Sequence, residues 1–193
     1  MVWNLLLAWI PLTAVAVVYE RQYRRPRVDG WTIAAGIVWL LFLPNCFYML
    51  TDLIHLHRTV EVSIVFDAVL LSSFIANGFL LGYISVYVMH RQLLRRWTEW
   101  QVAGMLAVVF LLSGFAIYLG RVLRWNSWDV LLNPAGLLFD VSDGIVNPLV
   151  HPQVLVTTTT FFLFIGAFYL VGYRVAMLLG GDKRVATKKR PRS

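Results

Sequence analysis

Long apolar runs separated by short polar connections dominate the sequence. Five such runs occupy residues 2–19, 30–50, 64–89, 101–120 and 154–179. Each approaches or exceeds the ~20 residues that a helix needs to cross the hydrocarbon of a bilayer. Because backbone groups in lipid must bond to one another, these runs are expected to be helices. The pattern predicts an all-α, polytopic integral membrane bundle with about five transmembrane helices.

The connection between the fourth and fifth runs is the longest. Its segment WDVLLNPAGLLFD, residues 128–140, contains Pro134 and is too short and too polar to cross. We expect a partly structured outer loop, and the sequence leaves open whether it lies on the surface or re-enters the membrane. The whole arrangement predicts a single transmembrane domain over residues 1–180 and a disordered basic tail over residues 181–193.

Composition favours the bilayer as the main partner of the chain. Hydrophobic residues make up 59% of it and charged residues 14%, whereas soluble domains average about 45–50% and about 25%. The net charge of +7 comes from basic residues between apolar runs, so nucleic acid is not an expected partner. Because Cys46 is the one cysteine, an intrachain disulfide and a cysteine-based metal site are both excluded.

Basic residues are concentrated in alternate connections, which predicts the orientation. Thirteen of the seventeen lysines and arginines fall after the first run, after the third run and in the tail. Six of the ten acids and three of the four histidines are predicted on the opposite face: five of the acids and the three histidines lie in the other connections, and Asp67 lies at the start of the third run. Cytoplasmic loops are rich in Lys and Arg. We therefore expect a multi-pass protein of the cell (plasma) membrane with its N-terminus outside and its C-terminus cytoplasmic. The first run begins at Met1 with no basic residues before it, which is typical of a retained span and not of a signal peptide.

The second run ends in a polar stretch, LPNCFYMLTDLIHL, at residues 43–56. Pro44 predicts a kink, and Asn45 is placed to bond the backbone that the kink frees. Asp52 and His55 lie three residues apart and share a face if the helix continues. Such a pair suits an oriented base, although a pair that only orders the loop is an equal alternative. Two ligands do not make a zinc site, so no metal is assigned.

The third run carries polar or small residues at two depths. Asp67 lies about a turn below the outer end, and ionisable residues at membrane depth commonly face the bundle interior; snorkelling to the surface is the alternative. Gly78 and Gly82 have the G-x-x-x-G spacing that lets another helix approach closely. Packing between helices is the favoured interpretation of this face, which is also a candidate contact for a homo-oligomer.

The stretch GRVLRWNSWDVLLNP, residues 120–134, holds the densest set of polar side chains. Arg121 and Arg124 are three residues apart on one helix face, and two guanidiniums so placed suit a phosphate or carboxylate. The tryptophans of this stretch are typical interface anchors. That role does not account for Asn126 and Asp129, which makes this stretch the strongest candidate for ligand binding.

Two motifs carry a resemblance to a known family. FLPNCFYMLTDLIHL and GFAIYLGRVLRWNSWDVLLNP, with the position of Asp67, resemble a bacterial family of multi-span membrane proteins catalogued as domain of unknown function 1361. The likeness extends from the second run to the end of the fifth. Cys46 stands where a small residue such as alanine is expected. The resemblance implies a topology and motif positions, in a bacterial inner membrane, but no reaction.

Three segments that are distant in sequence become polar at the same outer depth, which predicts one outward-facing site. The candidate catalytic residues are Asp52, His55 and Asp67. The candidate substrate-binding residues are Arg121, Arg124, Asn126, Asp129, Asn45 and Tyr48.

Three classes of function fit this prediction. The first is an enzyme or binding protein for an anionic lipid or lipid-linked headgroup, with the arginines on the phosphate and Asp52 with His55 as base. The second is a structural or assembly protein whose polar cluster locks helices together. The third is a small transporter or channel subunit, which needs polar residues along the whole crossing, and few lie deep. The sequence identifies no cofactor and does not decide whether the chain is an enzyme.

Overall fold

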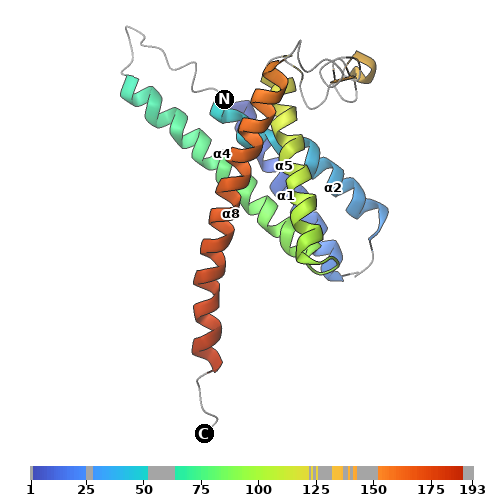
Figure 1. Cartoon of the computed structure of the whole chain (residues 1–193), viewed down its shortest axis with the longest axis vertical. Helices are drawn as coiled ribbons and strands as arrows, with labels where there is room; N and C mark the ends of the chain where they lie inside the picture. The colour runs from blue at the N-terminus through green and yellow to red at the C-terminus, as the bar shows by residue number, and fades with distance from the viewer. Residues whose placement is uncertain are drawn as a thin grey trace.

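The fold is an all-α bundle. The computed structural model describes residues 2–24, 28–51, 64–121, 123, 125, 132–136, 139, 141–142 and 152–188. Its helices are α1 (Val2–Arg24), α2 (Gly30–Phe42), α3 (Pro44–Tyr48), α4 (Ile64–Leu93), α5 (Glu99–Arg121) and α8 (Pro152–Lys188). The long helices run alternately up and down, with α4 inclined across the others (Figure 1). The described ranges contain no strand.

Five spans are long and apolar enough to cross a membrane, which confirms the predicted number. They correspond to α1, to α2 continued by α3, and to α4, α5 and α8. Large apolar side chains cover their outer faces; Val156 and Leu178 of α8, for example, are 65% and 75% exposed. Lipid is the solvent that suits such faces. The chain is therefore a multi-pass membrane protein.

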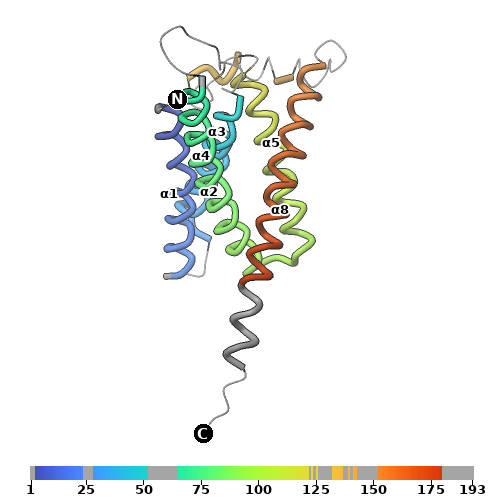
Figure 2. Tube along the Cα trace, turned by 90° about the vertical axis from the view of Figure 1, so that its left-hand side faces the viewer, coloured from blue at the N-terminus to red at the C-terminus, as the bar shows by residue number. Residues whose placement is uncertain are grey.

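The ends of the helices alternate between two ends of the bundle (Figure 2). The N-terminus, the end of α3, the start of α4, the end of α5 and the start of α8 lie at one end, named here the polar end. The connections from α1 to α2 and from α4 to α5 lie at the opposite end, named here the basic end. The predicted alternation of basic and polar connections therefore matches the fold. The side of the membrane that each end faces stays a prediction.

An acidic helix cap orders the turn between α1 and α2 at the basic end. Asp29 accepts hydrogen bonds from the backbone N–H of Thr32 at 2.9 Å and from its hydroxyl at 2.6 Å. Arg21 of α1 donates to the other carboxylate oxygen at 2.8 Å. The hydrogen bonds from Thr32, and then Arg21, hold the pKa of the Asp29 carboxyl below its usual value. A charged N-cap of this kind satisfies one of the free N–H groups of α2, that of Thr32, and its bond to Arg21 joins α2 to α1.

The second span breaks at Pro44, as the sequence predicts. Helix α2 ends at Phe42 and α3 begins at Pro44, because proline lacks the backbone donor that would continue the ladder. The side-chain amide of Asn45 donates to the carbonyl of Phe42 at 3.2 Å. The break turns α3 into contact with α1, α4 and α5. It therefore brings the end of the second span to the helices of the predicted site.

Close packing of α3 on α4 depends on two glycines. A Cβ at Gly78 would lie 2.6 Å from the carbonyl oxygen of Cys46, and a Cβ at Gly82 would lie 2.8 Å from the Cys46 Cβ. Cys46 itself is fully buried. The G-x-x-x-G face is thus occupied within one chain. A second copy would have to displace α3 to use it.

Two groups of helices meet along a row of rings, named here the aromatic seam. Helices α1, α2, α3 and α4 pack together, α5 packs on α8, and α3 contacts both groups. Ring pairs join α4 to α8, with centroids 5.7 Å apart for Phe79–Phe164 and 6.4 Å apart for Tyr83–Tyr169. Large rings fill a wider helix spacing than small residues do, which explains why the backbones of α4 and α8 stay apart.

Candidate functional site

The described part of the chain contains four of the nine predicted site residues. These are Asn45, Tyr48, Asp67 and Arg121. The other five lie outside the described residues, and they are Asp52, His55, Arg124, Asn126 and Asp129. The site is therefore built here from the four, and from the helix ends from which the others continue.

A hydrogen bond joins the end of the second span to the end of α5. The hydroxyl of Tyr48 donates to the carbonyl of Gly120 at 3.2 Å. A Cβ at Gly120 would lie 3.2 Å from the Tyr48 ring, so glycine is what lets the ring lie against this turn. Arg121 follows directly and is half-buried. The structure thus brings Tyr48 beside the helix end that carries Arg121, although the two lie far apart in sequence.

Hydrogen bonds close the described backbone on both sides of this junction. After α3 the hydroxyl of Thr51 donates to the carbonyl of Tyr48 at 2.7 Å, which closes the turn directly before Asp52. After α5 the backbone N–H of Trp125 donates to the carbonyl of Leu119 at 3.1 Å. The chain therefore folds back over the end of α5 at Trp125, and both polar motifs leave the bundle from one junction.

The described part of the connection between α5 and α8 packs against Trp125 at the same junction. A Cβ at Gly136 would lie 3.1 Å from the ring of Trp125, and the backbone N–H of Gly136 donates to the side chain of Asn133 at 3.2 Å. The described pieces of residues 132–142 lie beyond the helix ends at the polar end (Figure 2). Trp125, predicted as an interface anchor, is half-buried and also supports this loop.

Asp67 occupies a different position. It lies in the first turn of α4 and is half-buried. Figure 1 shows the start of α4 well apart from the end of α5. The described helices therefore bring Tyr48 beside the helix end that carries Arg121, keep Asn45 on the carbonyl of Phe42 in its own span, and leave Asp67 on a helix that diverges from the junction. Within the described ranges, no three His, Cys, Asp or Glu side chains gather as metal ligands.

A buried polar pair at the basic end escaped the sequence reasoning. The Nδ1 atom of His90 lies 2.6 Å from the hydroxyl of Tyr169, and the His90 ring lies 4.7 Å from the Tyr173 ring. Gln92 is 2% exposed, and its Oε1 has no hydrogen-bond partner in the described part of the chain. A histidine near the end of an apolar run is a signal that was available. Its partner on α8 was not readable from the sequence.

We expect Tyr48→Phe to weaken the junction without disturbing the ring contacts. The change removes the hydrogen bond to Gly120 and keeps the ring, so the free energy of unfolding should fall by about 1 kcal/mol. Unfolding in detergent micelles measures this. Tyr23→Phe is the control, because Tyr23 is 76% exposed and should change little. Equal stability of the two variants would show that the bond does not hold the junction.

The comparisons with known proteins place the chain in one family. The family described as "Protein of unknown function (DUF1361)" matches residues 3–168. This range includes all five spans up to Phe168 of α8, and both polar motifs. No curated protein and no solved structure matches the chain. The chain therefore belongs to the DUF1361 family.

Proposed function

We propose that the polar end of the bundle binds the anionic headgroup of a lipid or lipid-linked molecule. The observation that carries the proposal is the hydrogen bond from Tyr48 to the carbonyl of Gly120. It fixes the end of the second span beside the turn that presents Arg121. Two motifs rich in polar side chains then leave the bundle from one place at the membrane surface.

The chemistry of the junction suits a phosphate. A guanidinium is always charged and offers a planar fork of donors that matches phosphate oxygens. At the depth where spans end, the bilayer presents lipid phosphates, and reduced dielectric strengthens each charged hydrogen bond. In the proposal Arg121 and Arg124 hold the phosphate, and Asp52 and His55, which follow Thr51 in the sequence, act as base. Asp67, on the diverging helix, is not assigned a role in this site.

Two other classes of function are weighed against this one. A transporter needs polar groups along the crossing. In the described interior, however, Ser85 donates to the carbonyl of Gly82 at 2.8 Å and Ser113 to that of Val109 at 2.9 Å, so both hydroxyls are occupied by their own helices. The hydrogen bond from Tyr48 to Gly120 is equally compatible with an assembly protein. An assembly protein differs from the proposal in requiring no preference for one headgroup.

Lipid co-purification distinguishes headgroup binding from an assembly function. The protein is extracted from its membrane in mild detergent, and the retained lipids are compared by mass spectrometry with the lipids of that membrane. The proposal predicts enrichment of one anionic class over zwitterionic lipid. A retained lipid mixture with the same composition as the membrane would contradict the proposed headgroup binding and favour an assembly function.

The orientation is proposed from the charge distribution and is tested separately. A cysteine introduced at Ser142, which is exposed at the polar end, should react with an impermeant maleimide added to intact cells. Cys46 is fully buried, so the native chain should give little background. A reporter fused after Ser193 should be cytoplasmic. Labelling of Ser142→Cys only after the cells are opened would invert the orientation.

A further inference from the structure

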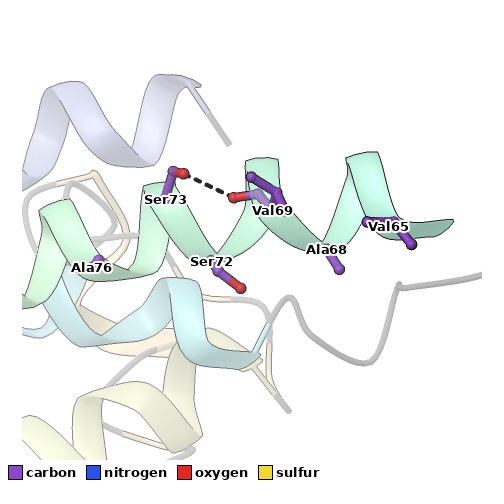
Figure 3. Close-up of a pocket in the computed structure, with 6 residues that line it drawn as sticks. All are labelled: Val65, Ala68, Val69, Ser72, Ser73 and Ala76. Atoms are coloured by element: carbon purple, nitrogen blue, oxygen red, sulfur yellow. Dashed lines mark hydrogen bonds between the residues drawn. The ribbon is translucent and has the colours of Figure 1, made fainter. Parts of the chain in front are cut away.

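A histidine near the end of α4 has its hydrogen-bond partner on another helix. Smaller polar side chains of α4 bond within their own helix: the hydroxyl of Ser73 donates to the carbonyl of Val69 at 2.8 Å (Figure 3), and the amide of Asn77 donates to the carbonyl of Ser73 at 2.8 Å. His90, by contrast, is 9% exposed, and its Nδ1 atom lies 2.6 Å from the hydroxyl of Tyr169 on α8. This pair therefore links the two groups of helices that meet along the aromatic seam.

Rings surround this pair near the basic end of the bundle. The centroid of the His90 ring lies 4.7 Å from that of Tyr173 and 5.9 Å from that of Tyr169. Another hydrogen bond between α4 and α8, from the hydroxyl of Tyr83 to the carbonyl of Ile165, is longer at 3.4 Å. Because the rings keep the two backbones apart, α4 and α8 are joined here through side chains, and the His90–Tyr169 bond is the shorter of these two links.

The protonation of His90 decides the direction of this bond. A neutral imidazole can accept a hydrogen bond at Nδ1 from the hydroxyl of Tyr169, whereas an imidazolium carries protons on both ring nitrogens and can only donate. The hydroxyl of Tyr169 must then accept, and its own proton has no other acceptor in the described part of the chain. A buried O–H without an acceptor costs free energy, as does a charge removed from water. Both costs arise only when His90 is protonated.

The charged groups near His90 do not offset these costs. Arg91, which follows it on α4, opposes a positive charge on the imidazole, and Glu99 at the start of α5 favours one. Both are exposed, so water screens them. No carboxylate in the described ranges lies within ion-pair distance of His90. Ring faces and the C-terminus of α4 attract a cation, but such attractions are usually smaller than the cost of burying an ion. The titratable groups around His90 on α4, α5 and α8 are Tyr87, Arg91, Glu99, Tyr169 and Tyr173.

We propose that the His90–Tyr169 pair is a proton-responsive latch, which holds α4 against α8 while His90 is neutral and releases them when it is protonated. An exposed histidine titrates at about pH 6.5, so the latch responds within the pH range of a living cell. It lies at the end of the bundle that is predicted to face the cytoplasm. Because α5 packs on α8, release moves these two helices together against the other group. The inference does not depend on headgroup binding at the polar end.

The dependence of stability on pH tests the latch. His90→Asn keeps an acceptor oxygen near the place of Nδ1 and cannot take up a proton. Unfolding of the full chain in detergent micelles is compared at about pH 7.5 and about pH 5.5, on either side of the range in which histidine titrates. As the pH falls, the unfolded chain binds a proton that the closed seam disfavours, so the wild type loses stability. We expect its folding equilibrium constant to fall about three- to tenfold further than that of His90→Asn. Equal falls would overturn the latch, and His90→Gln is the second neutral variant if His90→Asn is poorly folded.

Two tyrosine variants separate the hydrogen bond from the packing of the rings. Tyr169→Phe removes the bond and keeps the ring. Tyr173→Phe is the matched control, because it keeps the ring beside His90 and removes a hydroxyl that has no hydrogen bond in the described structure. We expect Tyr173→Phe to lose stability with falling pH as the wild type does, and Tyr169→Phe to lose less. A wild-type pH dependence in Tyr169→Phe would show that the bond is not the element that responds.

Spin labels measure the release itself. Cysteines for the labels replace Ile84 on α4 and Leu178 on α8, which are 48% and 75% exposed, and the distance between the labels is measured in bilayers by pulsed electron spin resonance at the same two pH values. We expect a longer distance at the lower pH when His90 is present and no change when His90→Asn is added. A distance that is independent of pH in the protein with His90 would overturn the proposal, even if its stability depends on pH.

Discussion

A methyl group added at Gly114 is expected to destabilise the bundle by about 1–3 kcal/mol, the usual range for overpacking. The added Cβ would lie 2.6 Å from the carbonyl oxygen of Thr158 and 3.2 Å from the backbone nitrogen of Phe162. Both atoms belong to the backbone of α8, so no side-chain rotation relieves the contact. Helices α5 and α8 must move apart along their interface. The gain in helix propensity from glycine to alanine, about 1 kcal/mol, offsets only part of this cost.

The matched control is Gly104→Ala on the same helix. A Cβ there would have no atom within 4 Å, so the change should leave stability equal or raise it by up to about 1 kcal/mol. Unfolding of both variants in detergent micelles, followed by loss of helical signal, measures the difference. Equal stability of Gly114→Ala and Gly104→Ala would show that α5 and α8 are not packed as closely as described.

The second large effect concerns Arg121. We expect Arg121→Lys to lower retention of the enriched anionic lipid at least about tenfold, while expression stays at the wild-type level. Lysine keeps the charge but loses the planar fork that binds two phosphate oxygens together. Arg121 lies in the last turn of α5, where either cation interacts favourably with the helix dipole. Lysine therefore keeps the favourable contribution of a positive charge at this helix end.

Arg91→Lys provides the control for charge at a membrane surface. Arg91 is exposed in the last turn of α4 at the basic end, where it contributes to general attraction of anionic lipid. Retention of the selected lipid should be unaffected by this change. If Arg121→Lys also retains that lipid, charge alone is sufficient, and the bidentate clamp is wrong.

The spans were predictable because one property, the length of an apolar run, decides them. The end of α1 was not predictable in this way: the helix extends to Arg24, although the apolar run ends at residue 19. Polar residues such as Arg21 continue a helix beyond the hydrocarbon as readily as they begin a loop. The bond from Arg21 to Asp29 then stabilises that extension. The position of an apolar run therefore predicts where the chain crosses the membrane, but not the residue at which the helix ends.

Partners across the bundle were much less predictable. The G-x-x-x-G spacing indicates that some helix approaches α4 closely, but nothing in it specifies Cys46 of the same chain. His90 and Tyr169 likewise meet because large rings set the distance between α4 and α8. At the candidate site, the polarity of each motif was readable. The Tyr48–Gly120 bond depends on the break at Pro44, whose direction the sequence does not give.

The central claim, that the polar end binds an anionic headgroup, is tested most directly by photo-crosslinking. An anionic lipid with a photoreactive group on its headgroup is incorporated with the protein into bilayers and irradiated, and the modified peptides are identified by mass spectrometry. We expect adducts in residues 43–56 and 120–134, reduced in Arg121→Lys and competed by unlabelled anionic lipid. Adducts confined to the basic end, in residues 91–97, would show only general attraction of anionic lipid to the basic surface and would contradict the claim.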